Sequence, residues 1–185
     1  MNRREFVLRK IREEAFLEGD FVLSSGQRSN FYIDIKKVSL TGDFLDAVGD
    51  MICDIAEKLN VFDFCGVELG GVPLVCSAII KMNQRGFSSR GIIIRKGKKD
   101  YGTSKLIEGP SVSRVIFLED VITTGKTTLE GIEILRQNKI EVSSVIAVVD
   151  RGGGKNIIEK GFRFFALFSF EEIKNFNLAE TEQRE

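Results

Sequence analysis

Residues 114–129 read RVIFLEDVITTGKTTL. They begin with a short apolar run at 115–118, rich in β-forming residues, which is typical of a strand buried on both faces. The carboxylates of Glu119 and Asp120 follow, where that strand is expected to end. A hydroxyl-rich turn at 123–128 comes next, and apolar residues then recur with helical spacing. The segment therefore predicts a strand, a turn and a helix N-terminus in succession.

The turn has the chemistry of a phosphate site. Free backbone N–H groups in the first helical turn, the positive end of the helix dipole and the threonine hydroxyls can converge on one phosphate. Two carboxylates beside such a turn would repel the phosphate unless they bind another part of the same ligand. Ionised carboxylates only accept hydrogen bonds, and a ribose offers two neighbouring hydroxyl donors. The segment thus predicts a site for a sugar that carries a phosphate.

Other interpretations of this segment are open at this point. An ordinary strand-to-helix turn with a polar N-cap would also contain these hydroxyl residues. The end of a nucleotide P-loop matches residues 125–127, but that motif has a glycine where Asp120 stands, so it does not fit. The run EDVITTG at 119–125 resembles instead the phosphoribosyl-diphosphate signature of the type I phosphoribosyltransferases.

The rest of the chain has the pattern of one α/β domain, for which 185 residues are sufficient. Apolar periodicity and turn residues predict helices at 3–17, after Thr41 and around Pro73, and strands at 21–23, 31–35, 62–67, 92–94, 145–149 and 164–168. This alternation predicts a parallel sheet with right-handed crossovers. In such sheets the ligand lies beyond the carboxyl ends of the strands, where the polar clusters fall.

Composition excludes several classes of function. Lysine plus arginine equals aspartate plus glutamate at 27 each, so the charge balance does not suggest a nucleic-acid partner. The absence of histidine excludes imidazole bases, catalytic triads that use imidazole and His-containing metal sites. Cys53, Cys65 and Cys76 lie in apolar surroundings and are expected to be reduced core residues of a cytoplasmic protein. We expect neither a signal peptide nor a membrane span.

Two further segments suggest anion binding. The basic run at 95–103, RKGKKDYGT, could be a solvated loop or a weak nucleic-acid patch, but it follows a strand end and favours a lid over an anionic group. A departing diphosphate gains negative charge, so cations stabilise its transition state more than its ground state. In the run at 66–73, Gly70 and Gly71 would let the backbone approach a second anion.

Several short patterns resemble the orotate phosphoribosyltransferases. They are F-x-L-x-S-G…S-x-x-Y at 21–32, R-K-x-x-K-x-x-G at 95–102, L-I-E-G at 106–109 and the pair Asp150-Arg151, in the same order as in that family. The resemblance implies a type I phosphoribosyltransferase fold, with a central, mainly parallel sheet flanked by helices and a small N-terminal hood. It implies one domain over 1–185, with the hood mainly at 1–40 and the core at about 41–170.

The resemblance also implies the reaction. Orotate and 5-phosphoribosyl 1-diphosphate would give orotidine 5′-monophosphate and diphosphate, the phosphoribosyl step of de novo UMP synthesis. Mg²⁺ would be carried by the phosphoribosyl diphosphate, without a direct protein ligand. A homodimer is implied, with Lys96 of the lid reaching into the partner's site; no nucleic-acid or membrane partner is expected.

Roles follow by position in the family motifs. Glu119 and Asp120 would hold the ribose hydroxyls, the turn at 123–127 the 5′-phosphate, and Arg151 the orotate carboxylate, which suits a planar guanidinium. The expected catalytic residues are Lys96, Lys99, Glu119 and Asp120. The expected substrate-binding residues are Tyr32, Ile33, Gly70, Gly71, Arg95, Lys96, Lys99, Tyr101, Glu119, Asp120, Val121, Ile122, Thr123, Thr124, Gly125, Lys126, Thr127 and Arg151.

The chain departs from the family pattern in four places. Tyr101 stands where the lid usually has histidine, Ser24 and Gly70 stand where many members have lysine, and Lys126 replaces a small residue. The alternatives are another type I phosphoribosyltransferase, such as one for a purine, or a non-catalytic regulator on the same fold that senses phosphoribosyl diphosphate or RNA.

Overall fold

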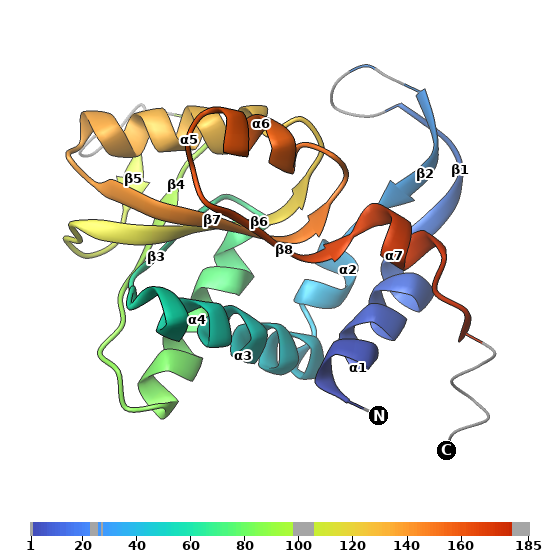
Figure 1. Cartoon of the computed structure of the whole chain (residues 1–185), viewed down its shortest axis with the longest axis horizontal. Helices are drawn as coiled ribbons and strands as arrows, with labels where there is room; N and C mark the ends of the chain where they lie inside the picture. The colour runs from blue at the N-terminus through green and yellow to red at the C-terminus, as the bar shows by residue number, and fades with distance from the viewer. Residues whose placement is uncertain (1, 23–25, 27, 98–105, 179–185) are drawn as a thin grey trace.

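The computed structural model describes residues 2–22, 26, 28–97 and 106–178. A six-stranded sheet lies at its centre in the order β5-β4-β3-β6-β7-β8, and every neighbouring pair is parallel except β4 with β5 (Figure 1). Its strands are β3 (Phe64–Val67), β4 (Gly91–Ile94), β5 (Ile107–Glu108), β6 (Arg114–Ile122), β7 (Glu141–Asp150) and β8 (Phe164–Ser169). The predicted parallel α/β sheet is confirmed.

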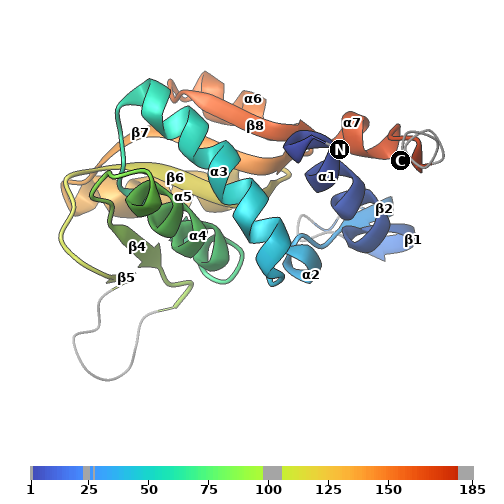
Figure 2. The same cartoon turned by 90° about the horizontal axis from the view of Figure 1, so that it is seen from below.

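Helices cover both faces of this sheet. On one face lie α1 (Arg3–Lys10), α3 (Gly42–Leu59) and α4 (Gly71–Gln84), seen from outside in Figure 2. On the other face lie α5 (Lys126–Gln137) and α6 (Gly154–Glu159). In β6, Ile116 and Leu118 pack into the first core while Val115 and Phe117 pack into the second. The apolar run at 115–118 is therefore uninterrupted because both faces of β6 are covered.

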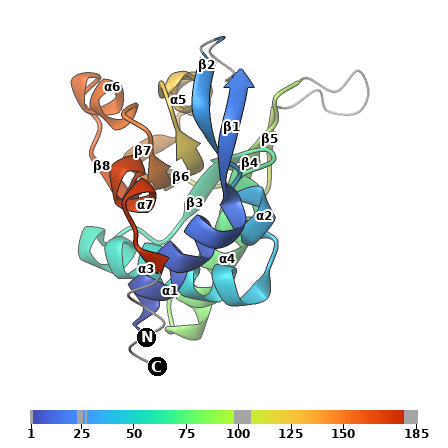
Figure 3. The ribbon, with the colours of Figure 1, turned by 90° about the vertical axis from the view of Figure 1, so that its right-hand side faces the viewer.

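The N-terminal part of the chain forms a hairpin at one end of the molecule. Strands β1 (Phe16–Val22) and β2 (Arg28–Ile33) pair antiparallel in a sheet of their own (Figure 3). The hairpin is joined to α1 by a π-helical turn, η1 (Ile11–Ala15), and is followed by the short helix α2 (Lys36–Ser39). Phe31 of β2 packs on Phe170 of α7 (Phe170–Lys174) with ring centroids 6.0 Å apart, so the two ends of the chain meet at the hairpin.

Several boundaries differ from the predictions. The N-terminal helix ends at Ala15 rather than at residue 17, because the buried ring of Phe16 already belongs to β1. Strand β6 continues to Ile122, so the two carboxylates lie within the strand and not beyond it. The short elements α2, α6, α7 and β5 were not predicted, since two to six residues carry too little periodicity.

One cysteine prediction was wrong. Cys53 and Cys65 are buried, as expected, but Cys76 is exposed on α4. An apolar neighbourhood in the sequence does not distinguish the two faces of a helix that packs on one side only. No helix within the described part of the chain is both long and apolar enough to span a lipid bilayer.

Candidate active site

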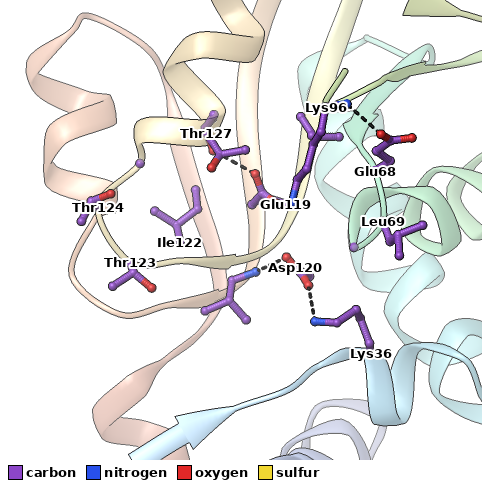
Figure 4. Close-up of a pocket in the computed structure, with 15 residues that line it drawn as sticks. Lys36, Glu68, Leu69, Lys96, Glu119, Asp120, Ile122, Thr123, Thr124 and Thr127 are labelled. Atoms are coloured by element: carbon purple, nitrogen blue, oxygen red, sulfur yellow. Dashed lines mark hydrogen bonds and ion pairs between the residues drawn. The ribbon is translucent and has the colours of Figure 1, made fainter. Parts of the chain in front are cut away.

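A pocket of about 620 Å³ opens at the carboxyl ends of β3, β4 and β6 (Figure 4). Its position agrees with the predicted edge of the sheet. The residues that line it are Lys36, Val67, Glu68, Leu69, Gly70, Lys96, Glu119, Asp120, Val121, Ile122, Thr123, Thr124, Gly125, Thr127 and Thr128. Ten of the sequence-predicted substrate-binding residues are in this set, and they come from the loop after β3, the loop after β4 and the β6–α5 segment.

The two neighbouring carboxylates of β6 make different contacts. Glu119 is 8% exposed, and its Oε2 accepts a hydrogen bond of 3.2 Å from the hydroxyl of Thr128 at the start of α5. The Asp120 side chain is 16% exposed and lies over the loop after β3; its Oδ1 accepts a 2.9 Å bond from the N–H of Val121 (Figure 4). Asp120 thus keeps acceptor capacity toward the pocket, whereas Glu119 is held against the helix.

The protonation of Glu119 is perturbed. Burial, followed by the nearby charge of Asp120, raises the pKa of Glu119 well above its usual range. The hydrogen bond from Thr128 opposes this rise but does not cancel it. The pair therefore resists carrying two full negative charges at once, and a ligand that donates hydrogen bonds or brings a cation would favour ionisation of both groups.

The turn between β6 and α5 has the geometry expected of an anion site. Gly125 is the N-cap of α5 with φ +77°, and a Cβ there would lie 2.9 Å from Ile157 Cδ1. Thr123, Thr124 and Thr127 line the pocket in front of the first turn of the helix. In that turn the backbone N–H groups are not used by the helix itself, so they and the hydroxyls can bind a phosphate.

The side chain of Lys126 does not contribute to this pocket. It is 80% exposed and lies 3.9 Å from Glu130 Oε1 one turn further along α5. Its backbone N–H lies 3.4 Å from the Thr124 hydroxyl oxygen. A role for Lys126 is therefore limited to its backbone, which explains why a long side chain is accommodated in a turn of this kind.

Helix α6 supports the turn from behind. The Asn156 Nδ2 amide donates a 2.9 Å bond to the Thr124 carbonyl. Asp150 Oδ1 accepts bonds from the N–H groups of Gly152 (2.8 Å) and Gly154 (3.0 Å), which orders the chain that leads into α6. In the sequence, Asp150 was noted only as part of the pair Asp150-Arg151, so this role was missed. The spacing of Asp150 from the following glycines, which is typical of an Asx turn, was the available signal.

The loop after β3 approaches Asp120 closely. A Cβ on Gly70 would lie 2.3 Å from Asp120 Cγ, so only glycine allows the carboxylate to lie against this backbone. Gly71 has a different role: a Cβ there would lie 2.8 Å from Gly66 Cα, so it permits β3 and α4 to pack together, and it does not line the pocket. The peptide bond between Glu68 and Leu69 is cis.

The cations predicted for the diphosphate are distributed unevenly. Lys96 lines the pocket, and its backbone N–H donates a 2.8 Å bond to Glu68 Oε1 (Figure 4). Arg95 Nη1 lies 3.6 Å from Glu108 Oε1 of β5, and Arg95 is not among the lining residues. Lys99 and Tyr101 lie outside the described residues. Lys36, Glu68 and Thr128 also line the pocket but were not predicted to bind substrate: Glu68 and Thr128 lie in the predicted anion-binding segments without an assigned role, and Lys36 lies outside every recognised motif.

Arg151 connects the core to the hairpin. Its Nη2 lies 3.3 Å from Ser29 Oγ and 3.4 Å from the Phe31 carbonyl, and its guanidinium lies over the Phe170 ring, 5.0 Å from the centroid. Burial lowers the pKa of Arg151, but a guanidinium stays charged in proteins. Tyr32 of the same hairpin packs on Phe21 with centroids 5.6 Å apart.

The two hairpin residues predicted to frame the base are separated from the pocket. Neither Tyr32, Ile33 nor Arg151 is among the residues that line it. Ile33 is buried, so only its backbone could face a ligand. The structure therefore brings the sugar-phosphate residues together in one pocket and places the predicted base-binding residues in a second group at the hairpin.

The chain is similar in sequence to known proteins. The orotate phosphoribosyltransferase of Pyrococcus horikoshii is 37% identical over 169 residues, covering 88% of this chain and 88% of that protein. That of Methanopyrus kandleri is 35% identical over 187 residues, covering 100% and 98%. No family model matches the chain.

A solved structure has the same fold. Mycobacterium tuberculosis H37Rv orotate phosphoribosyltransferase, in complex with 5-phospho-α-D-ribosyl 1-diphosphate, is 23% identical, with a TM-score of 0.77 over 94% of this chain and 99% of that one. The sheet order, the carboxylate pair and the threonine turn at its carboxyl edge define the class of protein as a type I phosphoribosyltransferase. Within that class the chain belongs to the orotate phosphoribosyltransferase family. It is an enzyme that transfers a phosphoribosyl group, and the predicted fold class and family are confirmed.

Proposed function

We propose that this chain transfers the 5-phosphoribosyl group from 5-phosphoribosyl 1-diphosphate to orotate, giving orotidine 5′-monophosphate and diphosphate in de novo UMP synthesis. One observation carries the proposal: a single pocket combines the carboxylates of Glu119 and Asp120 with the threonine turn at the start of α5. Acceptors for a ribose diol and donors for its 5′-phosphate thus lie within the reach of one ligand.

Each side of the pocket would bind one part of the substrate. Asp120, supported by Glu119, accepts hydrogen bonds from the ribose hydroxyls. The hydroxyls of Thr123, Thr124 and Thr127 and the N–H groups of the turn, including those of Gly125 and Lys126, are the candidates for the 5′-phosphate. Backbone N–H groups around Gly70 are the candidates for the diphosphate, together with Lys96, Arg95, and Lys99 and Tyr101 of the lid segment.

The metal expected with this substrate fits the pocket. Mg²⁺ takes oxygen ligands and usually keeps several waters while it binds substrate phosphates and one or two carboxylates. Phosphate oxygens of the substrate and water would supply these ligands, so the substrate would carry the ion without a direct protein ligand, and the acidic pocket beside Asp120 suits its positive charge. When bound, the ion would neutralise charge on the diphosphate.

The base would bind on the hairpin side. Arg151 carries a planar, permanently charged guanidinium that can pair with the carboxylate of orotate through two parallel hydrogen bonds. Its contacts with Ser29 and Phe31 hold it beside the backbone of Tyr32 and Ile33. That backbone would frame the pyrimidine ring.

No side chain with a tuned pKa is required for the transfer itself. The protein holds the two substrates in line, which removes most of the entropic barrier of a bimolecular step. The hairpin and lid exclude water, so that the ribosyl cation that develops is not hydrolysed. Cations around the diphosphate stabilise the charge that grows as its bond to the ribose breaks.

The organisation of the protein is also proposed from the family. The chain would act as one domain with a hood at 1–40, as a cytoplasmic homodimer in which Lys96 contributes to the partner's site. Analytical ultracentrifugation of the full chain tests the dimer directly.

A spectrophotometric assay tests the reaction. Orotate absorbance is followed with phosphoribosyl diphosphate, with and without Mg²⁺, and the loss is expected only when all three are present. Adenine, guanine and uracil serve as control bases that lack the carboxylate. Consumption of a purine, or binding of phosphoribosyl diphosphate without turnover of any base, would overturn the proposal.

A further inference from the structure

Lys36 extends into the pocket from a part of the chain that contains no recognised motif. It is the first residue of α2, after the hairpin, and its side chain is 43% exposed. Its Nζ lies 2.8 Å from Asp34 Oδ1 and 4.0 Å from Asp120 Oδ2 (Figure 4). Among the described residues that line the pocket, only Lys36 and Lys96 are cationic.

The surroundings of Lys36 keep it charged. Burial alone would lower the pKa of this ammonium, but the hydrogen bond to Asp34 and the charge of Asp120 outweigh burial, and the net pKa is raised. An ammonium has three donors. The distance to Asp34 is that of a hydrogen bond, whereas the distance to Asp120 is that of a loose ion pair. At least one donor therefore remains for an anionic ligand.

The position of Lys36 decides which anion it can reach. Asp120 lies between the threonine turn on one side and the Gly70 backbone on the other, and a Cβ on Gly70 would touch its carboxylate. Lys36 approaches Asp120 Oδ2 from α2, on the face of the core packed by α3 and α4. Oδ2 is also one of the two carboxylate oxygens that face Gly70, within 2.3 Å of that Cβ position. Lys36 is thus close to the loop after β3 rather than to the first turn of α5.

We propose that Lys36 binds an anionic oxygen of the diphosphate and that Asp34 is the positioning residue that holds its ammonium there. The inference rests on the proposed function. In the free protein Lys36 neutralises Asp120; once ribose hydroxyls engage Asp120, the ammonium turns to the diphosphate beside them. Charge on the diphosphate grows as the bond to ribose breaks, so this contact strengthens toward the transition state.

The test compares Lys36→Gln with Lys37→Gln, because Lys37 is the next residue and is exposed. For Lys36→Gln we expect the KM for phosphoribosyl diphosphate and the inhibition constant of diphosphate to rise roughly 10- to 100-fold, the range for a lost hydrogen bond between charged groups. The KM for orotate is expected to stay within about twofold of the wild-type value, because Arg151 and not Lys36 is the proposed partner of the orotate carboxylate. Lys37→Gln behaves as wild type.

Further variants separate binding from structure. Lys36→Arg keeps the charge and is expected to retain most of the affinity for diphosphate. Asp34→Asn is expected to lose part of that affinity, again without a change in the KM for orotate. An unchanged diphosphate constant in Lys36→Gln, or a change confined to the KM for orotate, would overturn the proposal. If Lys36→Gln does not fold by circular dichroism, the comparison of Asp34→Asn with wild type decides, and an unchanged diphosphate constant in Asp34→Asn would then overturn the proposal.

Calorimetry with diphosphate alone keeps this inference separate from the proposed function. Wild-type protein that binds diphosphate more tightly than Lys36→Gln supports the role of Lys36 even if orotate is not consumed. Equal affinity of the two proteins for diphosphate rejects that role even if orotate is consumed.

Discussion

The β6–α5 segment, which lines the pocket, and the hairpin of β1 and β2 are held together in different ways. In the β6–α5 segment, the bond between Thr128 and Glu119 joins residues nine positions apart in the chain, within one strand–turn–helix unit. At the hairpin, the contact between Arg151 and Ser29 joins residues 122 positions apart. The proposed sugar-phosphate site thus depends largely on a local segment, whereas the proposed base site forms only where segments distant in the chain meet.

This difference separates two kinds of recognition. A ribose 5-phosphate needs a strand end and a helix N-terminus, which one short segment supplies. Selection of a base, as proposed, needs a side chain such as that of Arg151 to be held in place by a distant element, here the hairpin. Substitutions in the two regions should therefore affect different substrates, and the following variants test that division.

The largest effect is expected for Asp120→Asn. Asparagine has the same shape and keeps the packing on Gly70, but it loses the charge that stabilises a cationic ribosyl group. Turnover should fall about 10²- to 10³-fold, the range for loss of one electrostatic contact to a transition state. Glu130→Gln, an exposed carboxylate of α5, is the control. Turnover within a few-fold of wild type in Asp120→Asn would contradict the assignment.

A smaller effect, confined to the base, is expected for Arg151→Ala. The KM for orotate should rise about 10²-fold, because a buried carboxylate would lose a bidentate partner. The KM for phosphoribosyl diphosphate should change little, since Arg151 does not line the sugar-phosphate pocket. Arg136→Ala, at an exposed position on α5, serves as the control. An unaltered KM for orotate would show that another residue binds its carboxylate.

The turn itself is tested by Gly125→Ala against Gly86→Ala. Both glycines have positive φ, +77° and +87°, where alanine costs about 1–2 kcal/mol. Gly86 has open space for a Cβ, whereas Gly125 has the Ile157 side chain and the Gly153 carbonyl in the way. Chemical denaturation should show the larger loss for Gly125→Ala, and only that variant should weaken binding of phosphoribosyl diphosphate. Equal losses in both would mean that α6 does not brace the turn.

The smallest effect is a pH-dependent change of stability in Glu119→Gln. The pKa of Glu119 is higher in the folded chain than in the unfolded one, so the folded chain binds more protons between those two values. Stability therefore decreases as pH rises through that window and stays lower above it. The glutamine variant lacks this loss. Its melting temperature should exceed that of wild type at alkaline pH by a few degrees, since roughly 2–4 °C corresponds to 1 kcal/mol in a chain of this size.

The control for Glu119 is the acidic end of the same titration. At about pH 4 both states of the wild type are largely protonated, so the two melting temperatures should converge. A constant difference across the pH range would indicate a packing change instead of a charge effect. Turnover should fall less in Glu119→Gln than in Asp120→Asn, because Glu119 is directed toward Thr128.

The local patterns were the reliable part of the sequence analysis. The segment at 114–129 predicted strand β6, the turn and α5, and all three are present. The prediction that Glu119 and Asp120 follow the strand was wrong by three residues, because pairing with β7 continues to Ile122. The β propensity of residues 119–122 does not reveal how far the neighbouring strand extends, and the neighbouring strand decides where β6 ends.

Burial and contacts between residues that are far apart in the chain could not be predicted from the sequence. Cys76 was expected in the core and is exposed, since burial depends on which face of α4 meets the sheet. Asn156 and Lys36 carry no motif, yet one supports the turn and the other reaches Asp120. Their roles arise from contacts with β6 and its turn, from which they are distant in sequence.

The sequence by itself determined the class of the fold, the phosphate turn and the carboxylate pair, because hydrophobic periodicity and turn chemistry act over a few residues. Only the tertiary structure decided which side chains share the pocket: Asp120 against Gly70, Glu119 against Thr128, and Lys36 near Asp120. The physical reason is that charge, burial and hydrogen bonding depend on distance in space, and a parallel sheet brings together at one edge residues that the chain keeps far apart.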